Sequence, residues 1–296
     1  MKVAVAQLAP GPNRAQNVAE TINAIREAAE RGAQLIVLPE LCTSSYQLGN
    51  EPLERWAEEI PAGESVQRWL REAEALDLYM VAGLLERAGD HCYNTALVLG
   101  PQGVLARYRK PHLFGWEGRR LTAGNGRFHS IDVEGARLGV LICYDLRFVE
   151  AVRLLALDQV QLLCVPVTWT DTGKSQPWDQ YGLCAAAHLA LGHAYANRLF
   201  VLCANRVGTE KRVRYLGNSL IAGPTGQAVA GPAGPDERAV LVTEIDPRQA
   251  DDKRVGPNDL FVDRRTDLYT IEMRSEKEVS HGLGFAREGG TGHRRQ

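Results

Sequence analysis

The sequence predicts an α/β protein in which helices cover mixed β-sheets. Three observations support this fold class. The chain opens with a strand, a helix and a second strand, which is the unit that packs helices on a sheet. Later, strand-like runs follow one another with no helix between them, as in antiparallel hairpins. No internal repeat or linker-like segment divides the middle of the chain, so we expect a single domain over residues 1–275 and a C-terminal extension over residues 276–296, disordered or packed on a partner subunit.

The opening unit has clear boundaries. Residues 2–8 alternate as a strand, and apolar side chains recur at helical spacing over residues 13–31. Gly32 is a typical residue just after the end of a helix. Residues 34–38 form a continuous apolar run, which indicates a buried strand, and Pro39 stops it.

The remaining elements follow from the same periodicities and from turn residues. Helices are expected over residues 65–74, 149–157 and, rich in alanine, 175–197. Residues 111–127 are polar, glycine-rich and irregular, and the Gly/Arg-rich tail from Glu288 is expected to be disordered. Strands are expected over residues 78–86, 92–99, 104–108, 128–133, 137–142, 160–166, 199–204, 217–222 and 239–244.

Composition excludes several classes of function. The chain has 296 residues, 45% of them hydrophobic, and a formal net charge of -2, which gives no reason to expect a nucleic acid or an anionic membrane as partner. No apolar stretch reaches the length of a membrane-spanning helix. The six cysteines are scattered without a CxxC pair, so we expect a reduced, cytoplasmic protein with no zinc site.

Chemistry-bearing side chains follow the predicted strands at the ends where ligands bind in open α/β sheets. Glu40, Lys110 and Cys143 each come directly after a strand, and Glu117 lies in the irregular segment after Lys110. A carboxylate to take the thiol proton, an ammonium to neutralise an oxyanion and a thiol nucleophile make up a site for acyl transfer. Taken singly, each residue also has an ordinary explanation as a surface charge or a buried core thiol.

The local sequences around these residues are more specific. Residues 38–41, 108–114 and 139–148 resemble the three signature segments of the nitrilase superfamily, the carbon–nitrogen hydrolases, in the family's order and with comparable separations. Supporting resemblance extends over about residues 2–270, including Asn94 and the segment 217–226. The resemblance implies a four-layer α-β-β-α sandwich and an assembly into homodimers or larger homo-oligomers.

The resemblance also implies roles for the four residues. Cys143 matches the family nucleophile, Glu40 the general base, and Lys110 the cation that stabilises the oxyanion together with the backbone N–H of Tyr144. Glu117 matches a second glutamate that positions the substrate amide, although the residues after it depart from the family pattern. No metal and no organic cofactor is needed, and the expected partner is a small amide.

The residues after the nucleophile indicate the branch of the family. Cys143-Tyr144-Asp145 resembles amidases, including ω-amidases and aliphatic amidases, whereas true nitrilases resemble Cys-Trp-Glu at this point. We therefore expect hydrolysis of a small aliphatic amide or ω-amide through a thioester. The alternatives are hydrolysis of an N-carbamoyl (ureido) compound, a nitrilase, and an inactive binding or scaffold protein.

Further residues lie in segments that resemble substrate-binding walls, or stand beside the predicted site. They are Tyr46, Trp116, Tyr144, Thr168 and Trp169. For the aromatic residues, plain core packing is an equally good explanation. One departure from the family pattern stands at residues 193–197, where a charged pair common in relatives is missing and His193 and Ala196 are found.

Overall fold

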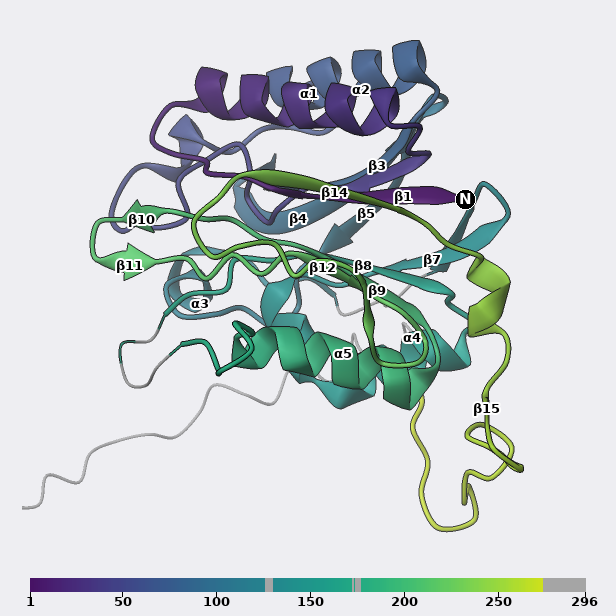
Figure 1. Ribbon diagram of the computed structural model, residues 1–296. Helices are drawn as coiled ribbons and strands as arrows, with labels where there is room; N and C mark the ends of the chain where they lie inside the picture. Colours follow the sequence, from purple (N-terminus) through teal and green to yellow (C-terminus); the bar gives the residue numbers. More distant parts are fainter. Residues whose placement is uncertain (126–129, 172, 174–176, 274–296) are drawn as a thin grey trace, which may run out of the picture. The chain divides into compact units, whose positions relative to one another are not determined.

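Figure 1 shows the computed structural model of the chain, which describes residues 1–125, 130–171, 173 and 177–273. Met1–Arg264 form one compact unit, and Arg265–Gln296 form a second, of which the described part contains only turns. The predicted extension over residues 276–296 lies outside the described residues, so the domain boundary at residue 275 stays a prediction.

The first unit is built on two six-stranded mixed sheets. The first sheet has the order β14 (Ala239–Glu244), β1 (Lys2–Gln7), β2 (Leu35–Val37), β3 (Tyr79–Ala88), β4 (His91–Gly100) and β5 (Gly103–Arg109). The second has the order β13 (Ala228–Ala230), β12 (Leu220–Ala222), β9 (Phe200–Ala204), β8 (Leu162–Pro166), β7 (Ala136–Val140) and β6 (Ser130–Val133). Two short hairpins are also present, β10 (Thr209–Glu210) with β11 (Val213–Arg214), and β15 (Arg254–Val255) with β16 (Asn258–Asp259).

Helices cover the outer face of each sheet. The pair α1 (Arg14–Glu30) and α2 (Glu64–Leu76) lies over the first sheet, and α4 (Val149–Leu157) with α5 (Ala185–Asn197) lies over the second (Figure 1). The short α3 (Glu117–Arg120) and three 3₁₀ turns, η1 (Leu53–Arg55), η2 (Cys143–Arg147) and η3 (Pro247–Ala250), complete the regular elements of the described ranges. The predicted α-β-β-α sandwich is therefore confirmed.

Alternation along β1 explains why the sheets are buried on both faces. Val3 and Val5 belong to the core between the two sheets, whereas Ala4 and Ala6 pack under α1 and α2. Successive side chains of a strand point to opposite faces of the sheet. A strand that has an apolar layer on each face therefore has apolar residues at every position. Parallel pairing of β1 with β2 and of β2 with β3 brings their carboxyl ends to one edge of the first sheet.

Two expectations about helices were wrong. Helix α5 begins at Ala185 rather than at residue 175, because the chain turns at Gly182 (φ +78°) and the Asp179 carboxylate accepts the N–H groups of Tyr181 and Leu183. Residues 174–176 lie outside the described ranges. The short helix α3 falls inside the segment expected to be irregular, and it carries Glu117.

None of the helices in the described ranges combines the length and the apolar character that a membrane span requires.

Candidate active site

Glu40 is held by tight packing of its backbone against β3. The strand β2 ends at Val37. The segment after it is hydrogen-bonded to β3, because the Leu38 N–H donates to the Val81 carbonyl and the Cys42 N–H donates to the Gly83 carbonyl. A Cβ atom at Gly83 would lie 2.7 Å from the Cα of Glu40, so only glycine allows this approach. The Glu40 carboxylate is fully buried.

Lys110 follows β5, where alternation separates two sets of side chains. Arg107 and Arg109 contact the buried Glu86, whereas Tyr108 packs in the core between the sheets. Lys110 is fully buried, and its own N–H donates to the Asn94 carbonyl at 2.9 Å. The strand alternation thus directs Lys110 inward beside β4.

Cys143 begins the 3₁₀ turn η2, just after β7 of the second sheet. Its φ of +45° lies in the left-handed region, which a non-glycine residue occupies at some cost and which is common at functional sites. The backbone N–H of Thr168, after β8, donates to the sulfur at 3.5 Å. The strained turn therefore presents the thiol at the carboxyl ends of two parallel strands, β7 and β8.

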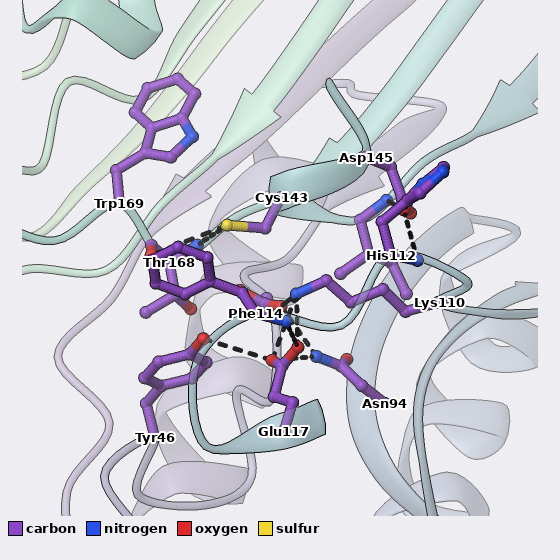
Figure 2. Close-up of polar contacts among 12 residues, drawn as sticks. Tyr46, Asn94, Lys110, His112, Phe114, Glu117, Cys143, Asp145, Thr168 and Trp169 are labelled. Carbon is purple, nitrogen blue, oxygen red and sulfur yellow. Dashed lines mark hydrogen bonds and ion pairs between the residues drawn. The ribbon is translucent and has the colours of Figure 1, made fainter. Parts of the chain in front are cut away.

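Glu40, Lys110 and Glu117 form one buried charge cluster, joined by Asn94. Figure 2 shows Lys110 and Asn94 pointing toward Glu117. Lys110 Nζ lies 2.7 Å from Glu40 Oε1 and 2.9 Å from Glu117 Oε2. The Asn94 amide donates to both carboxylates, at 2.7 Å to Glu40 and 2.9 Å to Glu117. Glu117 also accepts from the Tyr46 hydroxyl at 3.2 Å and the Phe114 N–H at 2.8 Å. Because every partner of Glu117 in this set is a donor, it is held as a carboxylate.

The charges of the cluster act on the cysteine. Burial raises the pKa of the Cys143 thiol well above its ordinary value, Glu40 adds to this rise, and Lys110 opposes it. Burial alone would lower the pKa of Lys110, but the two carboxylates outweigh it and raise that pKa. Burial and the charge of Glu40 raise the pKa of Glu117 despite Lys110. Burial, the largest cause of the raised pKa of Cys143, and the two carboxylates together favour the protonated thiol, and Lys110 alone favours the thiolate.

The Glu40 carboxylate has one buried oxygen, Oε2, for which the described part of the chain offers no hydrogen-bond partner. A buried unpaired carboxylate oxygen is costly unless a ligand or a reacting group completes it. The arrangement offers a proton acceptor, a fixed cation and a thiol in one place, which is what acyl transfer through a thioester requires.

A cavity of about 360 Å³ opens at the sulfur. Cys143, Tyr144, Thr168 and Trp169 line it, together with residues in the first turns of α5. The walls are mostly apolar, with a few charged side chains, among them Arg147 and Asp171. A concave, largely apolar site with a few polar groups is typical of small-molecule binding.

Comparison with known families settles the class of protein. Residues 2–254 match the family model described as carbon–nitrogen hydrolase. The chain belongs to the carbon–nitrogen hydrolase family. Its resemblance to this family, expected from the signature segments, is therefore confirmed.

Relatives of this hydrolase are named as nitrilases and amidases. It is 35% identical to a nitrilase of Pyrococcus abyssi over 274 residues, covering 91% of this chain and 99% of the relative. It is 32% identical to the human omega-amidase NIT2 over 287 residues, covering 92% and 98%. The amidase of Nesterenkonia sp. AN1, solved with acrylamide added to its active-site cysteine, superposes with a TM-score of 0.74 at 26% identity, covering 90% of this chain and 98% of that chain. Thiol-dependent hydrolysis of a non-peptide carbon–nitrogen bond is accordingly the reaction class of this hydrolase.

The structure distributes the predicted binding residues of this hydrolase over two places. Tyr144, Thr168 and Trp169 line the cavity with Cys143. Tyr46 instead lies behind Glu117, and Trp116 packs edge-on against Tyr46 with ring centroids 6.0 Å apart. Contact of Tyr46 and Trp116 with substrate stays a prediction.

Two residues of the site were not predicted as such. Asn94 entered the sequence argument only as a point of family resemblance, yet its amide bridges both carboxylates. Arg147 follows the nucleophile by four residues, and its place in the cavity wall depends on how η2 turns. The motif around Cys143 was the only signal that pointed to Arg147.

Proposed function

We propose that this hydrolase converts a small aliphatic amide or an ω-amide into the carboxylic acid and ammonia through a thioester on Cys143. The observation that supports this most directly is the buried cluster of Glu40, Lys110 and Glu117, whose charges act on the Cys143 thiol in the cavity wall. Glu40, Lys110 and Cys143 are the proposed catalytic residues, and Glu117 positions the substrate amide.

Formation of the thioester starts with the neutral thiol. The unpaired Oε2 of Glu40 takes the thiol proton as the sulfur bonds to the amide carbon, and the carbonyl oxygen becomes an oxyanion. Lys110 and the backbone N–H of Tyr144 stabilise that charge. When the intermediate collapses, the carbon–nitrogen bond breaks and Glu40 returns the proton to the leaving nitrogen, which departs as ammonia.

Hydrolysis of the thioester uses the same groups. Glu40 takes a proton from a water molecule as its oxygen bonds to the thioester carbon, and Lys110 again stabilises the oxyanion. The carbon–sulfur bond then breaks, the sulfur regains the proton from Glu40, and the carboxylic acid leaves.

The cavity supports an acyl chain with a charged end. Arg147 lines the wall and, within the described residues, takes part in no hydrogen bond or ion pair that would occupy its guanidinium. A planar guanidinium matches a carboxylate in bidentate fashion, so an ω-amide with a distal carboxylate fits this wall.

The test compares amides of equal length with and without the distal carboxylate. We expect ammonia release from both and an acyl adduct on Cys143 by mass spectrometry of the intact protein during turnover. Cys143→Ala should abolish both signals, whereas Cys92→Ala, at a half-buried cysteine, should keep them. Arg147→Gln should raise KM for the charged amide about tenfold or more and leave the neutral amide unchanged. Ammonia release from Cys143→Ala equal to the wild type would disprove the proposed nucleophile.

A second candidate is hydrolysis of an N-carbamoyl amine, which Asp171 favours. Its carboxylate lines the same cavity, where it would pair with a distal ammonium group. A ureido substrate releases carbon dioxide together with ammonia, so measurement of both gases separates the two reactions. Nitriles complete the panel, because they would yield the acid without a prior amide. A Cys143 that does not react with iodoacetamide near neutral pH would favour the inactive scaffold instead.

We also propose that the protein is cytoplasmic and forms a homodimer or larger homo-oligomer. All six cysteines are free thiols, which fits a reducing compartment. Exposed apolar side chains on the outer helices, Val149 (58% exposed) and Tyr195 (51% exposed), support a second copy as partner. Light scattering after size-exclusion chromatography would measure the assembly, and a monomer at micromolar concentration would contradict it.

A further inference from the structure

Asp145 stands between the two parts of the active site. It is fully buried, two residues after Cys143 in the turn η2, and therefore belongs to the second sheet's side of the site. Its carboxylate reaches the segment that carries Lys110, which continues β5 of the first sheet (Figure 2). Asp145 has no place in the proton transfers or in the wall of the cavity.

Four contacts make this link. Asp145 Oδ2 accepts from the Ile142 N–H at 3.0 Å and from the Tyr108 hydroxyl at 2.8 Å. Asp145 Oδ1 accepts from His112 Nδ1 at 2.8 Å and from the His112 N–H at 3.2 Å. Because an ionised carboxylate only accepts, His112 Nδ1 carries the hydrogen of this contact.

The positions of the donors are informative. Tyr108 and His112 stand two residues before and two residues after Lys110. The Ile142 N–H belongs to the residue directly before Cys143, whose backbone is in the left-handed region. The single buried carboxylate of Asp145 thus accepts hydrogen bonds from residues that precede and follow Lys110 in the sequence, and from the residue that precedes Cys143. In addition, the His112 ring stacks on Phe148, at the end of η2, with centroids 3.7 Å apart.

We propose that Asp145 and His112 are positioning residues, which fix the Lys110 ammonium at the place of the oxyanion relative to the Cys143 sulfur. This inference rests on the proposed function, because it assumes that Lys110 stabilises the oxyanion formed by attack of Cys143. The link joins the two sheets directly at the reacting groups. Displacement of a catalytic group by about 1 Å costs on the order of 100-fold in rate, so such a link has a measurable effect.

The main variant is Asp145→Asn, which keeps the shape of the side chain but replaces one accepting oxygen by a donating NH₂. It cannot accept at both ends, so one side of the link is lost. We expect kcat for ammonia release to fall about 100-fold with KM within threefold of the wild type. Asp158→Asn is the matched control, since the Asp158 side chain is 42% exposed and its partners among the described residues are Arg137 and Ser130. We expect it to keep wild-type kcat.

The His112 variants separate positioning from general packing. Asparagine places its amide nitrogen about where the imidazole Nδ1 lies, whereas alanine removes the donor. We expect His112→Ala to lower kcat about tenfold, in keeping with one charge-assisted hydrogen bond, and His112→Asn to recover most of that loss. If Asp145→Asn does not fold, this pair decides the question, because the backbone contacts of Asp145 remain.

A second readout is independent of amide turnover. Lys110 lowers the pKa of the Cys143 thiol, so a displaced Lys110 shifts the pH profile of Cys143 alkylation by iodoacetamide to higher pH. Glu40, Glu117 and Lys110 are the charged groups that act on the sulfur, and none of them is changed in these variants. A shifted profile in Asp145→Asn and in His112→Ala, restored in His112→Asn, supports the proposal.

The outcomes that overturn it are distinct. A folded Asp145→Asn protein with reduced unfolding free energy, but with kcat within twofold of the wild type and an unshifted alkylation profile, would show a purely structural aspartate. A His112→Asn protein no better than His112→Ala would equally reject positioning through Nδ1. If the wild type releases no ammonia from any amide, the proposed function fails, and the alkylation profiles still decide the inference.

Discussion

Gly83→Ala tests how tightly the position of Glu40 is set by the backbone of β3. The added Cβ would lie 2.7 Å from the Glu40 Cα, 2.7 Å from the Pro39 carbonyl oxygen and 2.9 Å from the Leu41 nitrogen. All three are backbone atoms, so no side-chain rotation relieves the contact. Ordinary contacts between non-bonded heavy atoms begin near ~3.5 Å, so the segment that carries Glu40 must move by about 1 Å.

The size of the effect follows from that displacement. A shift of about 1 Å at a catalytic group corresponds to roughly a 100-fold loss of kcat, or about 2.7 kcal/mol of activation free energy. Overpacking of this kind costs about 1–3 kcal/mol of unfolding free energy, which leaves a protein of this size folded at 25 °C. We expect kcat for ammonia release to fall far more than stability does.

The assay pairs turnover of an amide with urea unfolding of the same preparation. Gly192→Ala is the matched control: it makes the same substitution inside α5, where the new Cβ has no atom within 4 Å. It should keep kcat and gain about 0.4–1 kcal/mol of stability. A Gly83→Ala protein with wild-type kcat would refute the reasoning, because it would show that Glu40 tolerates the shift.

Three further predictions concern single charges. Glu117→Gln removes a carboxylate that raises the pKa of Cys143, so alkylation of the thiol should move to lower pH while amide turnover falls; an unmoved profile would contradict this. Glu86 is buried at full depth, and although burial raises its pKa, hydrogen bonds from Arg109 and Thr95 lower it overall. The stabilisation from the ionised Glu86 is therefore present above pH ~4.5 and lost as the pH falls further. Glu86→Gln should lower the unfolding free energy at pH 7 by about 3–5 kcal/mol and should make the protein lose less of its stability on acidification. Urea unfolding of both proteins at pH 7 and pH 4 would measure this. Burial lowers the pKa of Lys253 to about 8, so the unfolded chain binds the extra proton between pH 8 and pH 10.5 and stability should rise with pH in that window. Lys253→Met should remove this rise in urea unfolding at pH 7.5 and 9.5, and an equal slope in both proteins would show that Lys253 does not cause it.

Much of the site was predictable because it lies at strand ends that the sequence marks clearly. The apolar run before Glu40 ends at Pro39, and polar residues follow the run that ends at Cys143, so the sequence alone predicts that these side chains lie at the edge of a sheet. The family resemblance then supplied the pairing of segments that are remote along the chain. The strand Ala239–Glu244 has the bounds that its short apolar, β-branched run predicts.

What was missed depends on tertiary contacts. The expected helix extended from the alanine-rich stretch 185–197 back to residue 175, although a turn at Gly182 and hydrogen bonds to the Asp179 carboxylate keep the residues before Ala185 out of the helix. The bridging role of Asn94 depends on the pairing of β4 with β5, which sets it beside Lys110. The link through Asp145 is also a contact between sheets, and no local pattern encodes it.

The two sheets contribute different parts of the reacting set: Glu40 and Lys110 come from the first sheet, and Cys143 comes from the second. A nascent or partly folded chain that has formed only the first half holds acid and ammonium without a nucleophile. The hydrolytic site is therefore complete only in molecules in which both sheets have formed and packed together.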